Sequence, residues 1–206
     1  MKWNKPIIRI WRIYANKEFV YWNLSSHSDM LAGILKKEKM ETFKLEKSLL
    51  TDVDFDNMNW HDSFIYALTL GKKNELIFDI DYIFQWINPT RERNYFNFWV
   101  SPCTLVFENV YELKLDIEVS EPFEIEITDI QRDNPQKPKN ADYILRDIEY
   151  DWTIETNQGE ITFKSVGYKQ FVRQTPTLLD KQRIEIEKRN GISFDRQIAS
   201  NNYEEI

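Results

Sequence analysis

The residues best suited to chemistry in this sequence are His61 and Asp62, in the run Asn59-Trp60-His61-Asp62. A histidine held by a carboxylate can serve as the general base of a hydrolase. Successive strand residues point to opposite faces, so the two side chains would diverge if a strand began here. The competing interpretation is a turn in which both side chains bond to nearby backbone groups. His61 and Asp62 are therefore candidate catalytic residues under a second hypothesis.

A second candidate centre joins His61 to Asp79 and Asp81, which share one face of an expected strand. Positions i and i+2 of a strand lie roughly 7 Å apart, so these carboxylates could bind a metal ion together with the imidazole. The same alternation of polar and apolar residues recurs in other segments, which favours an ordinary solvated strand face. The alternative function is thus a hydrolase or metal-dependent enzyme that uses His61 with Asp79 and Asp81.

Other catalytic signatures do not occur in the sequence. It contains no glycine-rich phosphate loop and no CxxC, HExxH or GxSxG motif. Its single cysteine, Cys103, allows no internal disulfide. No base or positive charge adjoins this cysteine, so we expect a buried, unreactive thiol. These observations predict no cofactor and favour a protein that is not an enzyme.

Acidic residues dominate the polar positions of the later segments. Residues 111–160 carry 14 Asp and Glu but only 5 Lys and Arg, a charge that repels nucleic acid and attracts basic proteins. Like charges opposite one another destabilise a sheet, so an acidic patch on adjacent strands would indicate a basic partner. The competing explanation is solubility. The predicted partner-binding residues are Asp116, Glu118, Glu124, Glu126, Glu149 and Asp151.

The elements that must position these groups are mainly β-strands. Apolar and polar residues alternate along most of the chain, as they do in half-buried strands. Pro102 is expected to split one strand because it lacks a backbone N–H. Residues 51–59 and 131–140 are rich in polar and turn residues and are expected to be loops. The expected strands are 7–14, 18–24, 64–70, 76–82, 95–100, 104–107, 111–119, 123–127, 148–155 and 161–171.

Two segments have helical features. Residues 28–40 place Met30, Leu31, Ile34 and Leu35 at helical spacing and predict a helix. Residues 178–189 fit either a short helix, with Thr177 as its cap and Gly191 as its stop, or a strand.

The fold class expected from these elements is α+β, mainly β. Strands with one apolar face must cover that face, which a strongly curved antiparallel sheet or half-open barrel does for itself. An N-terminal helix, with or without a short C-terminal helix, would complete the fold. We expect a single domain, 1–206, with N-terminal strands and a helix in 1–58, the β core in 59–194 and a loosely ordered tail in 195–206.

The sequence also limits location and partners. Charged residues interrupt the N-terminal apolar runs before they could form a signal peptide. No apolar run approaches the roughly 20 residues of a membrane span. The expectation is a cytoplasmic protein that binds neither membrane nor nucleic acid, and the oligomeric state stays open.

Several segments carry a resemblance. The Trp-His-Asp run at 60–62, Phe98-Trp99-Val100-Ser101-Pro102-Cys103 and its continuation to Val110, and segments 167–173 and 189–194 resemble a group of small uncharacterised bacterial proteins, over residues 59–194. The Trp-His-Asp run is also similar to bacterial immunity-type proteins, which neutralise a toxin by binding it. This similarity implies an acidic, β-rich binder without catalysis. The first hypothesis is therefore a protein-binding module with a basic protein as partner.

Overall fold

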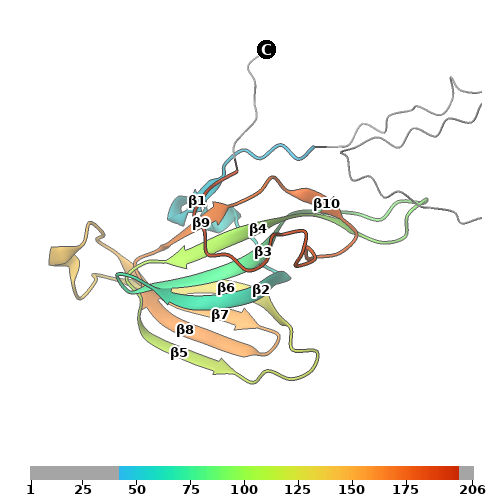
Figure 1. Ribbon diagram of the computed structural model, residues 1–206. Coiled ribbons are helices and arrows are strands. Elements are labelled where there is room, and N and C mark those ends of the chain that lie inside the picture. The colour runs from blue at the N-terminus through green and yellow to red at the C-terminus, as the bar shows by residue number, and fades with distance from the viewer. Residues whose placement is uncertain (1–41, 200–206) are drawn as a thin grey trace, which may run out of the picture. The chain divides into compact units, whose positions relative to one another are not determined.

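The computed structural model describes residues 42–199 of the chain (Figure 1). These residues form ten antiparallel strands and two short 3₁₀ helices. The strands are β1 (Leu49–Thr51), β2 (Ser63–Gly71), β3 (Glu75–Ile87), β4 (Asn97–Phe107), β5 (Tyr111–Ile117), β6 (Ile125–Gln136), β7 (Glu149–Thr156), β8 (Gly159–Ser165), β9 (Tyr168–Val172) and β10 (Thr177–Leu179). The helices are η1 (Asp52–Asn57) and η2 (Ala141–Tyr143).

All ten strands belong to one sheet, in the order β1-β9-β4-β3-β2-β6-β7-β8-β5, with β10 also beside β4. Strands β2 and β6 share only three residue pairs, and the sheet turns at this junction. The two halves then face one another: the ring of Phe107 on β4 lies 5.0 Å from Trp152 on β7 and 4.7 Å from Phe163 on β8. The sheet is not closed. The expected antiparallel, mainly β architecture is therefore confirmed.

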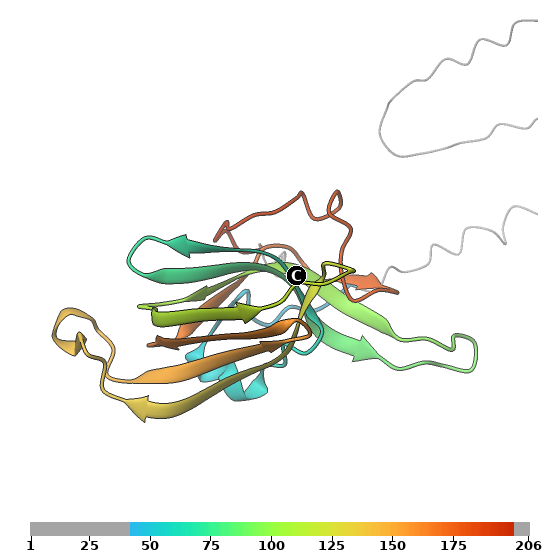
Figure 2. The ribbon, with the colours of Figure 1, turned by 90° about the horizontal axis from the view of Figure 1, so that it is seen from below.

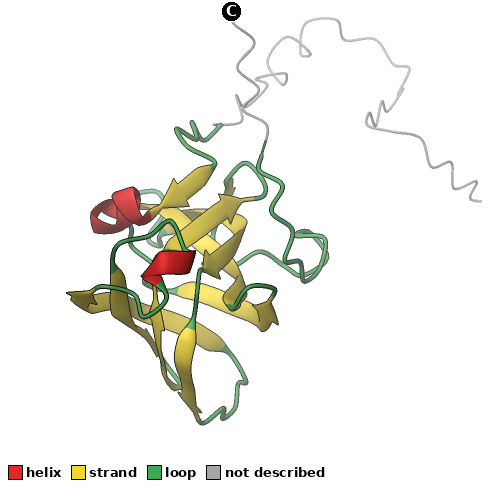
Figure 3. Cartoon of the chain, turned by 90° about the vertical axis from the view of Figure 1, so that its left-hand side faces the viewer, coloured by secondary structure: helices red, strands yellow, loops and turns green. Residues whose placement is uncertain are grey.

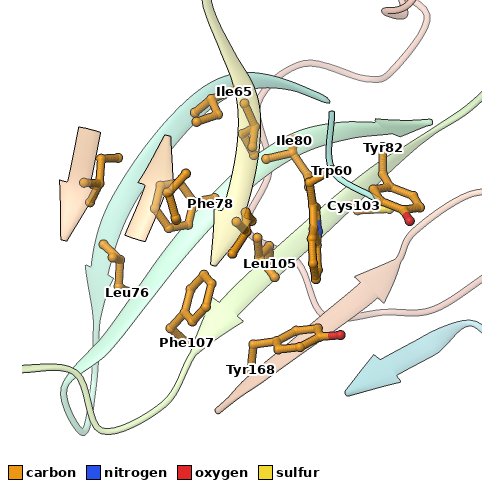
Figure 4. Packing of buried hydrophobic residues seen from close by; sticks show 14 of the residues in the cluster. Trp60, Ile65, Leu76, Phe78, Ile80, Tyr82, Cys103, Leu105, Phe107 and Tyr168 are labelled. Carbon is orange, nitrogen blue, oxygen red and sulfur yellow. The ribbon is translucent and has the colours of Figure 1, made fainter. Parts of the chain in front are cut away.

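The core lies between the two halves of the sheet. Strand β3 contributes every second residue from Leu76 to Tyr82, and β4 does the same from Cys103 to Phe107 (Figure 4). Trp60 and Tyr168 close this core, with ring centroids 5.4 Å apart. Each fully buried large apolar side chain contributes about 1.5–3 kcal/mol through removal from water. This core holds β3 in place, and with it the residues on the opposite face of that strand.

The outer face of β3 is covered by the chain itself. Residues 180–199, which we call the C-terminal strap, run across β3 and β4 after β10. Ile184 of the strap packs with Ile83, Phe98 and Val100 in a second, smaller cluster. The solvated face expected for Asp79 and Asp81 is therefore wrong, because both residues are fully buried beneath the strap.

The strap is not helical, so of the two forms considered for 178–189 the short helix is wrong, and the strand is found only in β10, Thr177–Leu179. After β10 it contains a single turn, in which the Arg189 N–H bonds to the Glu185 carbonyl. Its backbone is satisfied by side chains of the sheet: the N–H of Ile184 donates to Asp81 and that of Ser193 to Asp79. Apart from the Arg189–Glu185 bond, these contacts take the place of the i to i−4 bonds that a helix would need.

Strand β4 is continuous through Pro102, contrary to the expected split. β4 pairs with β10 over Phe98–Val100 and with β9 over Cys103–Phe107. Pro102 lies between these segments, and its carbonyl accepts a bond from the Arg173 N–H at 3.0 Å. Because the N and O of a strand residue point to the same side, the missing N–H faces the gap between β10 and β9.

Two expected loops are partly regular. Residues 131–136 belong to β6, since the register shift between Asp133 and Gln136 absorbs Asn134 and Pro135 as a bulge. Residues 52–57 form η1, which begins at Thr51 with a capping box. Within residues 42–199 the helices are limited to η1 and η2 (Figure 3), and none there is long and apolar enough to cross a membrane. The helix expected at 28–40 and the strands at 7–14 and 18–24 lie outside the described residues.

Candidate functional site

Four carboxylates lie in register across the outer face of β5, β8, β7 and β6, the strands side by side in the lower half of Figure 2. Asp116 is opposite Glu160, Glu160 is opposite Glu155, and Glu155 is opposite Asp129. Directly opposite residues of antiparallel strands share a face, with Cβ atoms about 4.5–5.5 Å apart. All four side chains are exposed. We call Asp116, Glu160, Glu155 and Asp129 the acidic row.

No cation of the described chain neutralises this row. None of the ion pairs within residues 42–199 includes any of its four members. The amide of Gln131 donates to Asp129 at 3.0 Å and to Glu155 at 3.3 Å. A neutral amide reduces the repulsion between these carboxylates but leaves their charge in place. The row is therefore a concentration of negative charge with no ion-pair partner in the part of the chain that the structure describes.

A shallow hollow of about 460 Å³ adjoins the acidic row at the β7–β8 turn. Asp116, Glu155 and Glu160 line it, together with Glu118 and Gln158. The Glu118 N–H donates to the Gln158 carbonyl at 3.0 Å, which holds the end of β5 against this turn. The arrangement offers a cationic side chain several carboxylates within one small, solvent-open depression.

The six residues predicted to bind a partner do not form one patch. Asp116 and Glu118 lie at the acidic row and its hollow. The other four are distributed elsewhere: Asp151 forms an ion pair with Lys164, Glu124 pairs with Arg183 at 2.5 Å, Glu126 lies opposite Phe64 on β2, and Glu149 is buried where it accepts a bond from Tyr111. Burial and the nearby Asp62 and Glu124 carboxylates raise the pKa of Glu126.

Sequence reasoning missed Asp129 and Glu160 as members of the site. One signal was present, because a two-residue turn at Asn157-Gln158 fixes the pairing of Glu155 with Glu160. The positions of Asp116 and Asp129 in the row depend on which strands are neighbours, and alternation along single strands does not show this.

The two carboxylates considered as metal ligands belong to a buried ionic network. The guanidinium of Arg189 lies between Asp79 and Asp81, donating to Asp79 at 2.6 and 2.8 Å and to Asp81 at 3.1 Å. Arg173 also donates to Asp79, and the Tyr66 hydroxyl donates to Asp81 at 3.1 Å. Two carboxylates and two guanidinium groups compensate one another, so the network is neutral.

Burial acts against both kinds of charge in this network, and the contacts between the opposite charges oppose that effect. Burial raises the pKa of Asp81, against the opposing influence of Arg189. Burial also acts to lower the pKa of Arg189, but its hydrogen bond to Asp79 and the nearby carboxylate charges outweigh this and raise that pKa. The guanidinium carbon lies 3.7 Å from the centre of the Tyr66 ring, which adds a cation–π contact.

These contacts leave Asp79 and Asp81 no free position for a metal ion. Each carboxylate accepts bonds from arginine and from a backbone N–H of the strap. Among residues 42–199 no group of three or more His, Cys, Asp or Glu side chains is arranged to hold a metal. The structure therefore does not bring His61 together with Asp79 and Asp81 as a ligand set.

His61 and Asp62 do contact each other, contrary to the expected divergence. Nδ1 of His61 lies 2.9 Å from Oδ1 of Asp62, and Gln182 donates to the other carboxylate oxygen at 2.7 Å. The two residues converge because they lie in a turn before β2, with Asp62 at φ 63°. The imidazole is oriented and exposed. Among the described residues, however, no hydroxyl or thiol is hydrogen-bonded to the imidazole, whose contacts are with Asp62 and the Trp86 ring.

Comparisons with known proteins do not place the chain in a family. No protein-family model, curated protein or solved structure matches it. The features that bear on function are therefore the geometry and charge of the acidic row, the His61–Asp62 pair and the buried network.

Proposed function

We propose that this protein is a non-enzymatic binding module that recognises a basic protein through its acidic row, as an immunity protein would bind a basic toxin. The observation that carries the proposal is the register of Asp116, Glu160, Glu155 and Asp129 across four adjacent strands. Directly opposed like charges destabilise a sheet. A cationic partner removes that repulsion, so binding releases free energy that the unbound protein cannot recover by itself.

The charge pattern of neighbouring positions supports this proposal. On the same outer face, Asp151 is paired with Lys164, and Glu112 is paired with Lys139 at 2.8 Å. Solubility alone requires net charge and gives no reason for four uncompensated acids in one line. A row of this kind also steers a basic partner during diffusion, which raises the association rate at low salt.

The alternative is a hydrolase that uses His61 oriented by Asp62, and the 2.9 Å contact between them favours it. A general base needs a nucleophile or a water within hydrogen-bond reach. We prefer the binding proposal because it accounts for four exposed carboxylates that face one another across adjacent strands, which hydrolysis by His61 would leave without a reason. Substitution His61→Ala separates the two hypotheses, because it abolishes hydrolysis under the alternative and leaves partner binding unchanged under the proposal.

The proposal is tested with two variants that remove the same number of charges. Wild-type protein captures its partner from a lysate of the source cells, mass spectrometry identifies it, and calorimetry measures Kd for each variant with the purified partner. The row variant carries Asp116→Asn, Asp129→Asn, Glu155→Gln and Glu160→Gln; the control variant carries Glu92→Gln, Asp142→Asn, Asp180→Asn and Glu187→Gln, all at exposed positions on other segments.

The expected result is specific to the row. Kd rises about tenfold or more in the row variant and changes little in the control variant, because charges at an interface act locally. Raising the salt from about 0.1 M to about 0.5 M weakens wild-type binding, since the screening length falls from about 10 Å to roughly 4 Å. Equal affinities for the two variants would show that the acidic row does not bind the partner.

A further inference from the structure

Strand β5 is an open edge of the sheet. It pairs with β8 on one side, and among residues 42–199 no strand pairs with its other side. The opposite end of the sheet is β1, which has only three residues. A short edge strand offers little for another chain to pair with, whereas β5 has seven residues and pairs regularly with β8 from Lys114 to Ile117.

The unpaired backbone groups of β5 can be assigned from the pairing with β8. The N–H of Glu118 points to β8, where it donates to Gln158. Groups on a strand alternate in direction, so the N–H of Asp116 also points to β8, and those of Leu115 and Ile117 point to the open side. Leu115 and Ile117 thus present donors and acceptors that have no partner in the described chain.

The first half of β5 is protected against pairing and the second half is not. A register shift separates Tyr111 from Lys114, and Glu112 adopts a left-handed backbone with φ 54°. Such bulges twist an edge away from incoming strands. From Lys114 to Ile117 the pairing with β8 is regular. The segment able to accept a strand therefore coincides with the end of β5 that carries Asp116.

We infer that the basic partner adds an extended segment to the edge of β5, so that its strand continues the sheet next to the acidic row. This inference rests on the proposed function, since it names the part of the partner that the row recognises. Main-chain hydrogen bonds to Leu115 and Ile117 supply the pairing, as in other cases of strand addition. The row supplies the charge complementarity that selects a basic segment.

The side chains of β5 specify the sequence of the added strand. Asp116 and Glu118 lie on the outer face, so cationic residues belong opposite them, while a cation opposite Lys114 would be repelled. Leu115 is 52% exposed at the margin of the core and lies opposite the buried Ile161. An apolar residue beside Leu115 would extend the core. The partner segment therefore alternates polar and apolar residues, with basic residues opposite Asp116 and Glu118 and an uncharged residue opposite Lys114.

The test uses a defined probe, a peptide of roughly five residues that covers 114–118, in which lysine and valine alternate except that threonine takes the position opposite Lys114. Fluorescence anisotropy measures its affinity for the full chain, and a matched peptide with N-methylated valines keeps the charge but cannot form the ladder. In the protein, Leu115→Pro removes one outward N–H at an edge position that tolerates proline. Leu115→Ala retains that N–H and serves as its control.

Strand addition predicts that Leu115→Pro and the N-methylated peptide each weaken binding about tenfold, while Leu115→Ala has a clearly smaller effect. Hydrogen exchange of the Leu115 and Ile117 amides in the wild-type complex should slow, and that of Asp116, already bonded to β8, should not change. This readout decides the question even if Leu115→Pro fails to fold.

Two outcomes would overturn the inference. Binding that the row variant weakens, but without protection of Leu115 and Ile117, would show that the acidic row acts without strand addition and would leave the proposed function intact. No binding of the alternating peptide would reject the edge as the docking element. The proposed function itself fails only if the row and control variants bind the identified partner equally.

Discussion

The molecule contains two groups of acidic residues in opposite environments, one buried and one exposed. Asp79 and Asp81 are fully buried under the C-terminal strap and neutralised by Arg189 and Arg173. The acidic row is exposed and has no cationic partner among residues 42–199. Both groups come from strands in which polar and apolar residues alternate. The difference shows that a polar strand face becomes part of the interior or stays exposed according to whether a remote segment covers it.

The largest effect expected from this comparison is the loss of Arg189. The variant Arg189→Ala leaves two carboxylates buried with only Arg173 to compensate them, so the free energy of unfolding should fall by about 3–5 kcal/mol. Urea denaturation followed by tryptophan fluorescence measures it. Lys188→Ala, at an exposed position one residue away, should change stability by less than about 0.5 kcal/mol. A loss below about 1 kcal/mol in Arg189→Ala would mean that the strap does not secure the fold.

The next effect is the coupling between Arg189 and Asp81. A double-mutant cycle with Arg189→Ala and Asp81→Ala should give a favourable interaction energy of about 1–3 kcal/mol, because the two side chains share one network. The corresponding cycle with Asp116→Ala and Glu160→Ala should give an interaction of opposite sign, since these like charges repel. Couplings of the same sign at both pairs would contradict the distinction between the two regions.

Sequence reasoning predicted the strands well and their surroundings poorly. Alternation correctly predicts that Asp79 and Asp81 share one face of β3. The arginine that neutralises them, Arg189, lies 110 positions after Asp79 in the sequence. No local pattern connects residues at such separation. Pro102 was read as a break because the change of neighbour from β10 to β9, which accommodates it, depends on tertiary pairing. Local periodicity fixes which residues share a face, and long-range topology decides what covers that face.

The same limit applies to the candidate site. The turn at Asn157-Gln158 could have revealed the Glu155–Glu160 pair, because it sets the register of one hairpin. The order β5-β8-β7-β6, which completes the row with Asp116 and Asp129, follows from no single hairpin. For His61 and Asp62 the outcome depends on the local backbone, because a strand would separate the two side chains whereas the turn that the chain forms brings them together.

Removing the charge of the acidic row should stabilise the free protein slightly. The row variant relieves three opposed pairs of like charges, so its free energy of unfolding should rise by about 0.5–1 kcal/mol at low salt. Added salt should stabilise the wild type and narrow this difference, because screening weakens the repulsion. The control variant should show neither effect. A row variant less stable than the wild type would indicate that Gln131 and the carboxylates form a net stabilising arrangement.

The smallest expected effect concerns Asp151, an acid on the outer face that, unlike the acidic row, is paired with a lysine. The hydrogen bonds from Lys164 and Asn134 lower the pKa of Asp151. A lowered pKa in the folded state stabilises the protein above the unfolded value of about 4, and this contribution disappears as the pH falls through the folded pKa. Lys164→Met should therefore cost only a few tenths of a kcal/mol at pH 7, because solvent screens the pair, and almost nothing at about pH 2. NMR titration of the Asp151 carboxyl in the variant should show its pKa rising, whereas the row variant should leave that pKa nearly unchanged. A rise in both variants would mean that the row acts on Asp151 as strongly as its own partner does, and the outer face would then be one coupled electrostatic surface.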